Sequence, residues 1–292
     1  MKRSISFILS SVLIGVVLVC VLFLSVVATP TDVFYDNYNN TLSTKYDTLV
    51  NTKSPKIIII TGSSAAFSLD GDLLAKETGI NVANTAIHAG SGALWETELS
   101  KANIQAGDIV LLAFEWGWAT DENYVDSFGT DIVMTGIDEK IEMYKYLPWA
   151  KYKDVLGYLF TYAAKKRTYS GGDTGAYSHS AFSESGNTMS LRHDGSPVIA
   201  NYETDPDHYG RITFQDVVIP EKTVEYFKKY KKYVEEKGAS VYWIGCPTYE
   251  AAVQCDLDEL TKAVEQIEST TGIKYISNPI DYVFQGKYMI FP

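Results

Sequence analysis

The sequence predicts an α/β protein with about five parallel strands in one sheet, helices on both faces of that sheet, and one N-terminal transmembrane helix. Short runs of β-branched residues indicate strands that are buried on both faces, as in parallel sheets. They alternate with segments whose apolar residues recur at helical spacing, which is typical of a three-layer α/β/α arrangement. An uncharged apolar run at the N-terminus is long enough to cross a membrane.

The first element is this apolar run, which begins after Lys2 and Arg3 and extends to about residue 31. A membrane span needs about 20 apolar residues, whereas the apolar region of a signal peptide has about 7–15. We therefore interpret residues 1–31 as a short cytoplasmic end and a membrane anchor, with the rest of the chain extracytoplasmic because the basic residues precede the span. A signal peptide cleaved after Ala28 is the alternative, and a bulky valine before Cys20 disfavours a lipoprotein signal.

The remainder of the chain is acidic. Residues 32–292 contain 23 basic and 36 acidic residues, a net charge of −13. This balance argues against nucleic acid or anionic lipid headgroups as partners. The 21 tyrosines and five tryptophans either cover the surface of an exported protein or form platforms for sugars. We expect a polar spacer at residues 32–55 and one α/β domain at 56–292.

Five strands are predicted in this domain. The first is KIIIITGSS, residues 56–64, in which consecutive isoleucines run into a Gly-Ser-Ser turn. The other four are residues 80–86, 108–116, 240–247 and 274–277. Helices with periodic apolar residues are predicted at 92–103, 221–236 and 256–270.

Residues 117–220 interrupt this alternation. Two helical stretches, 137–146 and 149–167, are followed by a long polar segment rich in glycine and serine. An irregular segment of that length in a compact domain is usually functional or disordered. We interpret residues 117–220 as an insertion above the carboxyl ends of the strands, where open α/β sheets bind ligands.

A serine after the first strand is the main candidate for chemistry. Ser64 lies in a turn at the carboxyl edge of the sheet, where helix N-terminal amides can support an oxyanion. The simpler interpretation is that Gly-Ser-Ser only turns the chain and caps a helix. The second strand is followed by a glycine-rich turn, residues 84–92, that contains His88 and Gly90, and the third strand ends at Glu115 and a tryptophan.

Together these three turns resemble the SGNH-hydrolase (GDSL-like) superfamily. They resemble in particular its membrane-anchored branch of bacterial cell-surface proteins, which includes proteins of teichoic-acid alanylation and polysaccharide O-acetylation. The resemblance covers residues 56–116 and, by topology, 238–284, and residues 177–187 (YSHSAFSESGN) look like a recurring element of the branch. It implies a flavodoxin-like α/β fold.

The resemblance also implies roles for individual residues. Ser64 takes the position of the nucleophile, and its backbone N–H that of one oxyanion donor. Gly90 is the nearest match for the glycine donor, although Ala86 occupies the family's glycine position. The asparagine donor has no match after the third strand, where Glu115 stands. Glu115 and His88 are predicted to position a loop or a substrate hydroxyl.

The family's Asp-x-x-His element, which activates and orients the serine, follows the fifth strand. Here Asp281 is followed three residues later by Phe284, so that match fails. Our hypothesis is that the aspartate and histidine lie beyond Pro292, within about 40 residues, the length of one more helix and its loop. None of the remaining histidines is predicted to be the general base: His179, His193 and His208.

These expectations lead to two functions. The first is a serine esterase or O-acyltransferase that acts on cell-surface glycans through an acyl-enzyme on Ser64. The alternative is a catalytically incomplete SGNH-like partner or binding domain that assists a membrane acyltransferase. A solute-binding receptor is supported by the architecture alone. No cofactor is expected, no spacing indicates a metal site, and Cys246 and Cys255 form either a disulfide or two buried thiols.

Overall fold

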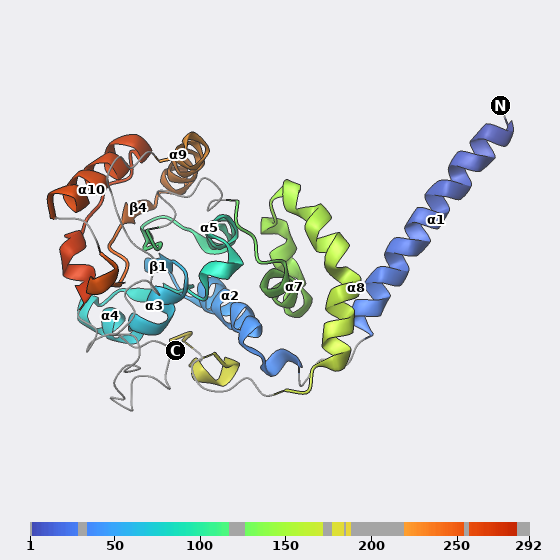
Figure 1. The fold of residues 1–292 in the computed structure, drawn as a ribbon, viewed down its shortest axis with the longest axis horizontal. Coiled ribbons are helices and arrows are strands. Elements are labelled where there is room, and N and C mark those ends of the chain that lie inside the picture. Colours follow the sequence, from blue (N-terminus) through green and yellow to red (C-terminus); the bar gives the residue numbers. More distant parts are fainter. Residues whose placement is uncertain are drawn as a thin grey trace.

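The centre of the protein is a four-stranded parallel sheet. The structure, a computed structural model, describes residues 2–28, 34–116, 126–171, 177–183, 185–187, 219–253 and 257–284 (Figure 1). The strands are β1 (Lys56–Ile60), β2 (Asn81–Asn84), β3 (Ile109–Leu112) and β4 (Ser240–Trp243), in the order β2-β1-β3-β4. The predicted mixed α/β class with a parallel sheet is therefore confirmed.

The two central strands, β1 and β3, are buried on both faces, which explains why they are almost uniformly apolar. Side chains alternate between faces along a strand, so Ile58 and Ile60 belong to one core cluster, whereas Ile57 and Ile59 belong to another. The first cluster includes residues of four helices: α2 (Thr41–Asn51), α5 (Ala93–Ser100), α9 (Glu221–Glu236) and α10 (Leu257–Thr271). Leu74 of α4 (Gly71–Thr78) packs against the second.

The predicted fifth strand is reduced to a single bridge in the described part of the chain. Tyr275 pairs in parallel with Trp243, but the ladder does not continue. A continued ladder would pair the N–H of Gly245, two residues after Trp243, with a backbone carbonyl. This N–H donates instead to the side-chain oxygen of Ser277 at 2.8 Å. A separate short parallel pair joins β5 (Thr248–Tyr249) to β6 (Val283–Phe284).

The helix predictions differ in their accuracy. The predictions for α9 and α10 are confirmed to within a residue or two, and α5 continues into a 3-10 turn at Lys101–Asn103. The predicted helix at 137–146 is wrong in its extent, because α7 (Thr130–Glu139) ends and a 3-10 helix occupies Ile141–Tyr146. Lys140, which separates the two helices, has φ −127° and ψ 83°, and this non-helical backbone conformation ends α7. The stretch 149–167 is a 3-10 turn followed by α8 (Tyr152–Thr168).

The segment predicted as a polar spacer, 32–55, is part of the packed domain from residue 34 onward. Helix α2 lies in it, and the side chains of Tyr38, Leu42, Tyr46 and Leu49 are buried. Their spacing of three and four residues is helical, but two of the four are tyrosines within a run of Asn and Thr, so the apolar stripe is inconspicuous.

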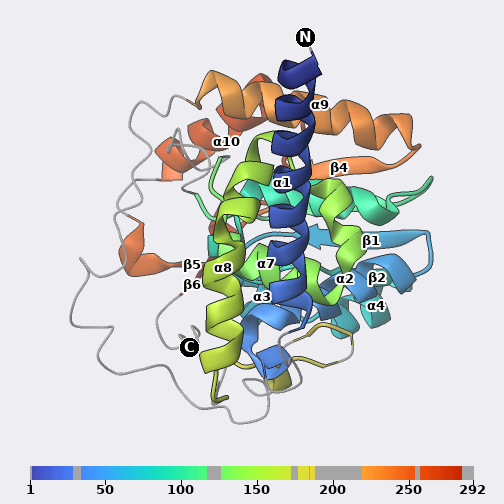
Figure 2. The same ribbon diagram turned by 90° about the vertical axis from the view of Figure 1, so that its right-hand side faces the viewer.

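The N-terminal helix α1 (Lys2–Val27) projects from the domain (Figures 1 and 2). Its stretch Arg3–Val26 is long and apolar enough to cross a membrane. Its C-terminal end is in contact with the domain: Val26 is buried in a cluster with Phe34, Tyr162 and Ala163. Helix α8 is therefore the element on which α1 is seated.

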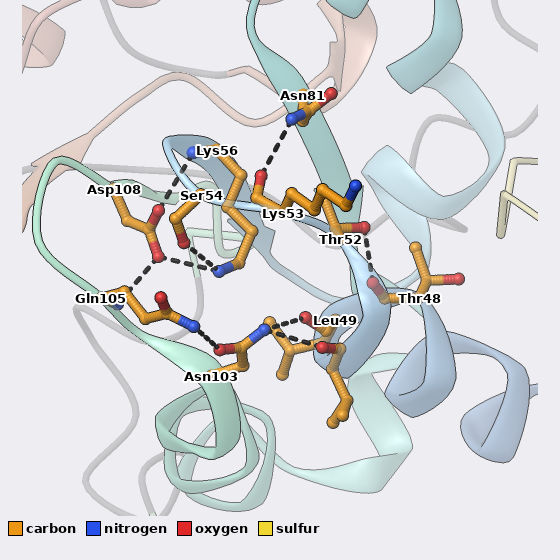
Figure 3. A network of polar contacts seen from close by, with 11 residues as sticks. Thr48, Leu49, Thr52, Lys53, Ser54, Lys56, Asn81, Asn103, Gln105 and Asp108 are labelled. Carbon is orange, nitrogen blue, oxygen red and sulfur yellow. Dashed lines mark hydrogen bonds and ion pairs between the residues drawn. The ribbon is translucent and has the colours of Figure 1, made fainter.

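A buried ion pair joins β1 to β3 at their amino ends (Figure 3). The Lys56 ammonium lies 2.9 Å from Asp108 Oδ2, and both side chains are fully buried. Asp108 also accepts the backbone N–H groups of Lys56 and Gln105, and Lys56 donates to Ser54 Oγ. The network fixes the register of the two strands at the end of the sheet opposite to Ser64.

Candidate functional site

Ser64 and Glu115 meet at the carboxyl edge of the sheet. Ser64 lies in the first turn of α3 (Ser63–Ser68), which begins three residues after β1 ends, and Glu115 lies three residues after β3. The Ser64 hydroxyl donates to Glu115 Oε1 at 2.8 Å, and the Ser64 N–H is 3.3 Å from the same oxygen. Both side chains are half-buried. The structure thus brings together two of the predicted site residues.

This contact has two chemical consequences. The Glu115 carboxylate orients the Ser64 hydroxyl and can accept its proton when the oxygen attacks an electrophile. The same oxygen also receives the Ser64 N–H, which is the group predicted to stabilise an oxyanion. A substrate carbonyl that used this N–H would have to displace Glu115 from it.

The glycine-rich turn after β2 is held by its own side chains. The N–H of Gly90 donates to His88 Nδ1 at 2.8 Å, so the second predicted oxyanion donor is also engaged. Ser91 donates through its hydroxyl to the His88 carbonyl and to the Glu96 carboxyl group. Gly92 has φ +95°, and a Cβ there would lie 1.9 Å from the carbonyl oxygen of Ser127, so only glycine fits.

This turn determines the tautomer and the charge of His88. Because Nδ1 accepts the Gly90 N–H, the proton of the neutral imidazole is on Nε2. Burial lowers the pKa of His88 below its ordinary value, and the nearby Glu115 carboxylate opposes part of that effect. His88 is therefore uncharged at neutral pH and electrostatically coupled to Glu115.

Cys246, for which the sequence left open a disulfide or a buried thiol, is a neighbour of both Ser64 and Glu115. Burial raises the pKa of its thiol, as does the Glu115 charge, whereas a hydrogen bond with the Ser64 side chain lowers it. Cys246 is a buried free thiol, and Cys255 lies outside the described residues. The register between β3 and β4 explains why Cys246 is close to Glu115. Leu112 pairs with Trp243, so Glu115 and Cys246, each three residues further along, follow neighbouring strands at the same level.

Glu96 is the second residue that sequence reasoning missed. It is a buried residue of α5, and burial raises the pKa of its carboxyl group well above the usual range. The Ser91 hydrogen bond opposes this rise and Glu115 adds to it. Its position in the first turn of a helix that follows a glycine-rich loop was the available signal.

Part of the insertion lies beside the turn. Tyr177 makes edge contacts with the rings of His88 and Tyr38, at centroid distances of 6.4 and 5.2 Å. Phe182 packs near Tyr38, and His179 Nε2 is 2.9 Å from Thr44 Oγ1. The described part of 177–187 therefore covers the side of the site next to His88, whereas His193 and His208 lie outside the described residues.

Within the described residues, the C-terminal segment packs against the turn that follows β4. Asp281 belongs to a 3-10 turn, Pro279–Tyr282, and the Tyr282 ring lies so close to Gly245 that a Cβ there would meet it at 2.3 Å. Phe284 is in β6.

Three polar turns thus meet at one sheet edge, with Ser64 and Glu115 in contact, His88 and Cys246 coupled to Glu115, and Gly90 held by His88. Within the described residues there is no group of three His, Cys, Asp or Glu side chains that could hold a metal ion. Comparisons of the chain with protein-family models, with curated proteins and with solved structures find no match.

Proposed function

We propose that the chain is a membrane-tethered, extracytoplasmic serine esterase or O-acyltransferase of the SGNH type that acts on cell-surface glycans. The observation that carries this proposal is the 2.8 Å hydrogen bond from the Ser64 hydroxyl to the Glu115 carboxylate at the carboxyl edge of the sheet. A serine that donates to a base at the start of a helix is the arrangement that nucleophilic acyl transfer requires.

The reaction would proceed in two halves. The Ser64 oxygen attacks the carbonyl carbon of an acyl ester while its proton passes to Glu115, and the tetrahedral intermediate collapses when the leaving alkoxide takes that proton. Water or a sugar hydroxyl then attacks the acyl-enzyme, gives its proton to Glu115, and releases Ser64 protonated again. An N–H donor for the intermediate becomes accessible only when Glu115 moves off the Ser64 backbone amide.

The proposed location follows from α1. With Lys2 and Arg3 before the apolar stretch, the N-terminus is cytoplasmic and the domain faces the envelope. The finer fold proposal, a flavodoxin-like three-layer α/β/α domain, is supported by the parallel sheet and by the helices that contribute to the clusters on its two faces. Such folds bind ligands at the carboxyl edge, where Ser64 lies.

The test is covalent labelling of the purified full chain in detergent with a fluorophosphonate, which reacts with activated serines. We expect one adduct per chain at Ser64, no adduct in Ser64→Ala, and full labelling in Ser63→Ala, the matched control from the same turn. Glu115→Gln should slow labelling by about 10²-fold or more, because general-base assistance is typically worth that much. Labelling of Ser64→Ala at the wild-type rate would exclude the proposed nucleophile.

A second function, that of a non-catalytic partner of a membrane acyltransferase, is favoured by one observation. Both predicted oxyanion donors are engaged within the protein, the Ser64 N–H by Glu115 and the Gly90 N–H by His88. If the wild-type chain is folded and binds acylated glycan but takes up no fluorophosphonate, the partner function is the correct one.

A further inference from the structure

Helix α8 is fixed to the domain by one face and exposed on another. Tyr158 and Tyr162 donate to Asp131 and Asp138 of α7, both at 3.1 Å. Among the described residues outside α1, nine large apolar side chains are exposed, and five of these lie between positions 141 and 160: Ile141, Tyr144, Trp149, Leu156 and Phe160. The exposed apolar surface of the domain is therefore concentrated on α8 and the turns that precede it.

The exposed stripe on α8 continues into the contact with α1. Leu156 and Phe160 are 51% and 63% exposed and are four residues apart, so they lie on one side of the helix. Ala163, three residues further, is buried in the cluster that contains Val26 of α1. The apolar surface of α1 and the stripe on α8 are therefore adjacent parts of one surface.

The ends of the stripe have the composition of a membrane interface. Trp149 precedes α8 and is 87% exposed. Lys153 and Arg167, at helical spacing from Leu156 and Phe160, are exposed near the two ends of the helix. Tryptophan prefers the headgroup layer, and long basic side chains extend from apolar surface to phosphate groups.

The geometry places this stripe close to the bilayer that α1 would span. A helix of 24 residues is about 36 Å long, compared with about 30 Å for the hydrocarbon core, so one end reaches into the headgroup layer. The end that meets the domain is the turn around Val26, which contacts α8. Figures 1 and 2 both show α8 beside α1, on the side of the domain from which α1 departs.

We propose that the outer face of α8, with Trp149, Leu156 and Phe160, rests in the phospholipid headgroup layer of the membrane that α1 crosses. This inference depends on the proposed anchoring role of α1. Phospholipid is the occupant that fits, because the stripe continues the apolar surface of α1 and has basic residues near its ends. The acidic remainder of the domain would be repelled by anionic headgroups, so the contact is confined to this face.

The experiment is site-specific photo-crosslinking of the full chain in vesicles of phosphatidylcholine and phosphatidylglycerol. A benzophenone-bearing phenylalanine analogue replaces Phe160, Leu13 of α1 or Leu73 of α4, one position at a time. Leu73 is the matched control, because it is 51% exposed and α4 lies on the opposite side of the domain from α1 (Figure 1). Mass spectrometry of the intact chain counts lipid adducts.

We expect lipid adducts at positions 13 and 160, with a yield at 160 several-fold above that at 73. Adducts at 13 with equal background at 160 and 73 would overturn the contact of α8 while leaving the anchor intact. No adduct at 13 would overturn the anchor and this inference together, and would leave the role of Ser64 untouched. A crosslinked pair of chains at 160, or a protein adduct there in native membranes without lipid adducts, would assign the face to a protein partner instead.

Discussion

At the scale of single residues, Glu115 is the group that links the polar turns. It accepts both donors of Ser64 and acts electrostatically on His88, Cys246 and Glu96. One carboxylate thus affects the ionisation of three side chains from three different segments. Replacing it should change the titration of groups that it does not touch through a hydrogen bond.

His88 provides a measurable case. Burial places its pKa below the ordinary 6.5, and the negative charge of Glu115 raises it, because a nearby carboxylate favours the imidazolium. Glu115→Gln removes that charge, so the pKa of His88 should fall further. We expect NMR titration to show the imidazole resonance shifting at lower pH in the variant than in wild type.

The control is Glu142→Gln, which removes an exposed charge from the 3-10 helix Ile141–Tyr146 and should leave the His88 titration unchanged. A rise of the His88 pKa in Glu115→Gln would contradict the coupling. The sign for stability follows from the same shift. Because the folded state binds the His88 proton less tightly than the unfolded chain, His88 makes the fold less stable as pH falls below about 6.5.

At the scale of elements, the Lys56–Asp108 pair determines how β1 and β3 meet. Both side chains are fully buried, so removing one partner leaves an uncompensated charge in the core. We expect Asp108→Asn to lower the free energy of unfolding by about 3–5 kcal/mol, measured by urea denaturation in detergent. Glu225→Gln, which breaks the exposed pair with Lys229, is the control and should cost about 0–1 kcal/mol.

The double variant Lys56→Met, Asp108→Leu distinguishes the effect of an unpaired buried charge from the effect of altered packing. Apolar residues of similar volume often replace a buried ion pair without loss, so the double variant should be more stable than Asp108→Asn. If the single and double variants unfold at the same urea concentration, the loss comes from packing and the ion pair is not its cause.

The sequence predicts elements best where apolar residues follow a single period. The isoleucines of β1 and the stripe of α9 are of this kind, and both elements appear where expected. Helix α2 was not predicted, because its buried face has only Leu42, Tyr46 and Leu49 as large apolar residues among polar ones. The fifth strand is shorter than predicted, because the N–H of Gly245 donates to the side chain of Ser277 and not to a backbone carbonyl.

The candidate site shows the same division. Ser64, His88, Gly90 and Glu115 were marked by turns at the ends of predicted strands, and the first and last prove to be in contact. Cys246 was not marked, since its proximity depends on the register between β3 and β4, which is set by pairing between segments more than 100 residues apart. Local patterns do not contain that information.

At the scale of the whole molecule, orientation is the property to measure. With two basic residues at the start of α1, before its apolar stretch, the domain should lie outside the cytoplasm. We expect proteinase K to digest the domain on intact spheroplasts while a cytoplasmic marker protein survives. If the domain is digested only after lysis, it lies in the cytoplasm and the predicted orientation is wrong. Release of the chain by alkaline carbonate would show that α1 does not span the bilayer.

The seating of α1 on the domain has a consequence for reach. The Lys166 ammonium is hydrogen-bonded to Asp138 at 2.5 Å and to the carbonyl oxygen of Val26 at 3.3 Å, so the last turn of α1 is joined to the domain. A tethered enzyme on a flexible stalk samples substrates over a range of heights. Under the proposed anchoring and esterase function, a domain mounted in this way would hold Ser64 at a constant height and would search in two dimensions as it diffuses laterally. The protein would then act only on those positions along an envelope polymer that pass through one thin layer above the membrane.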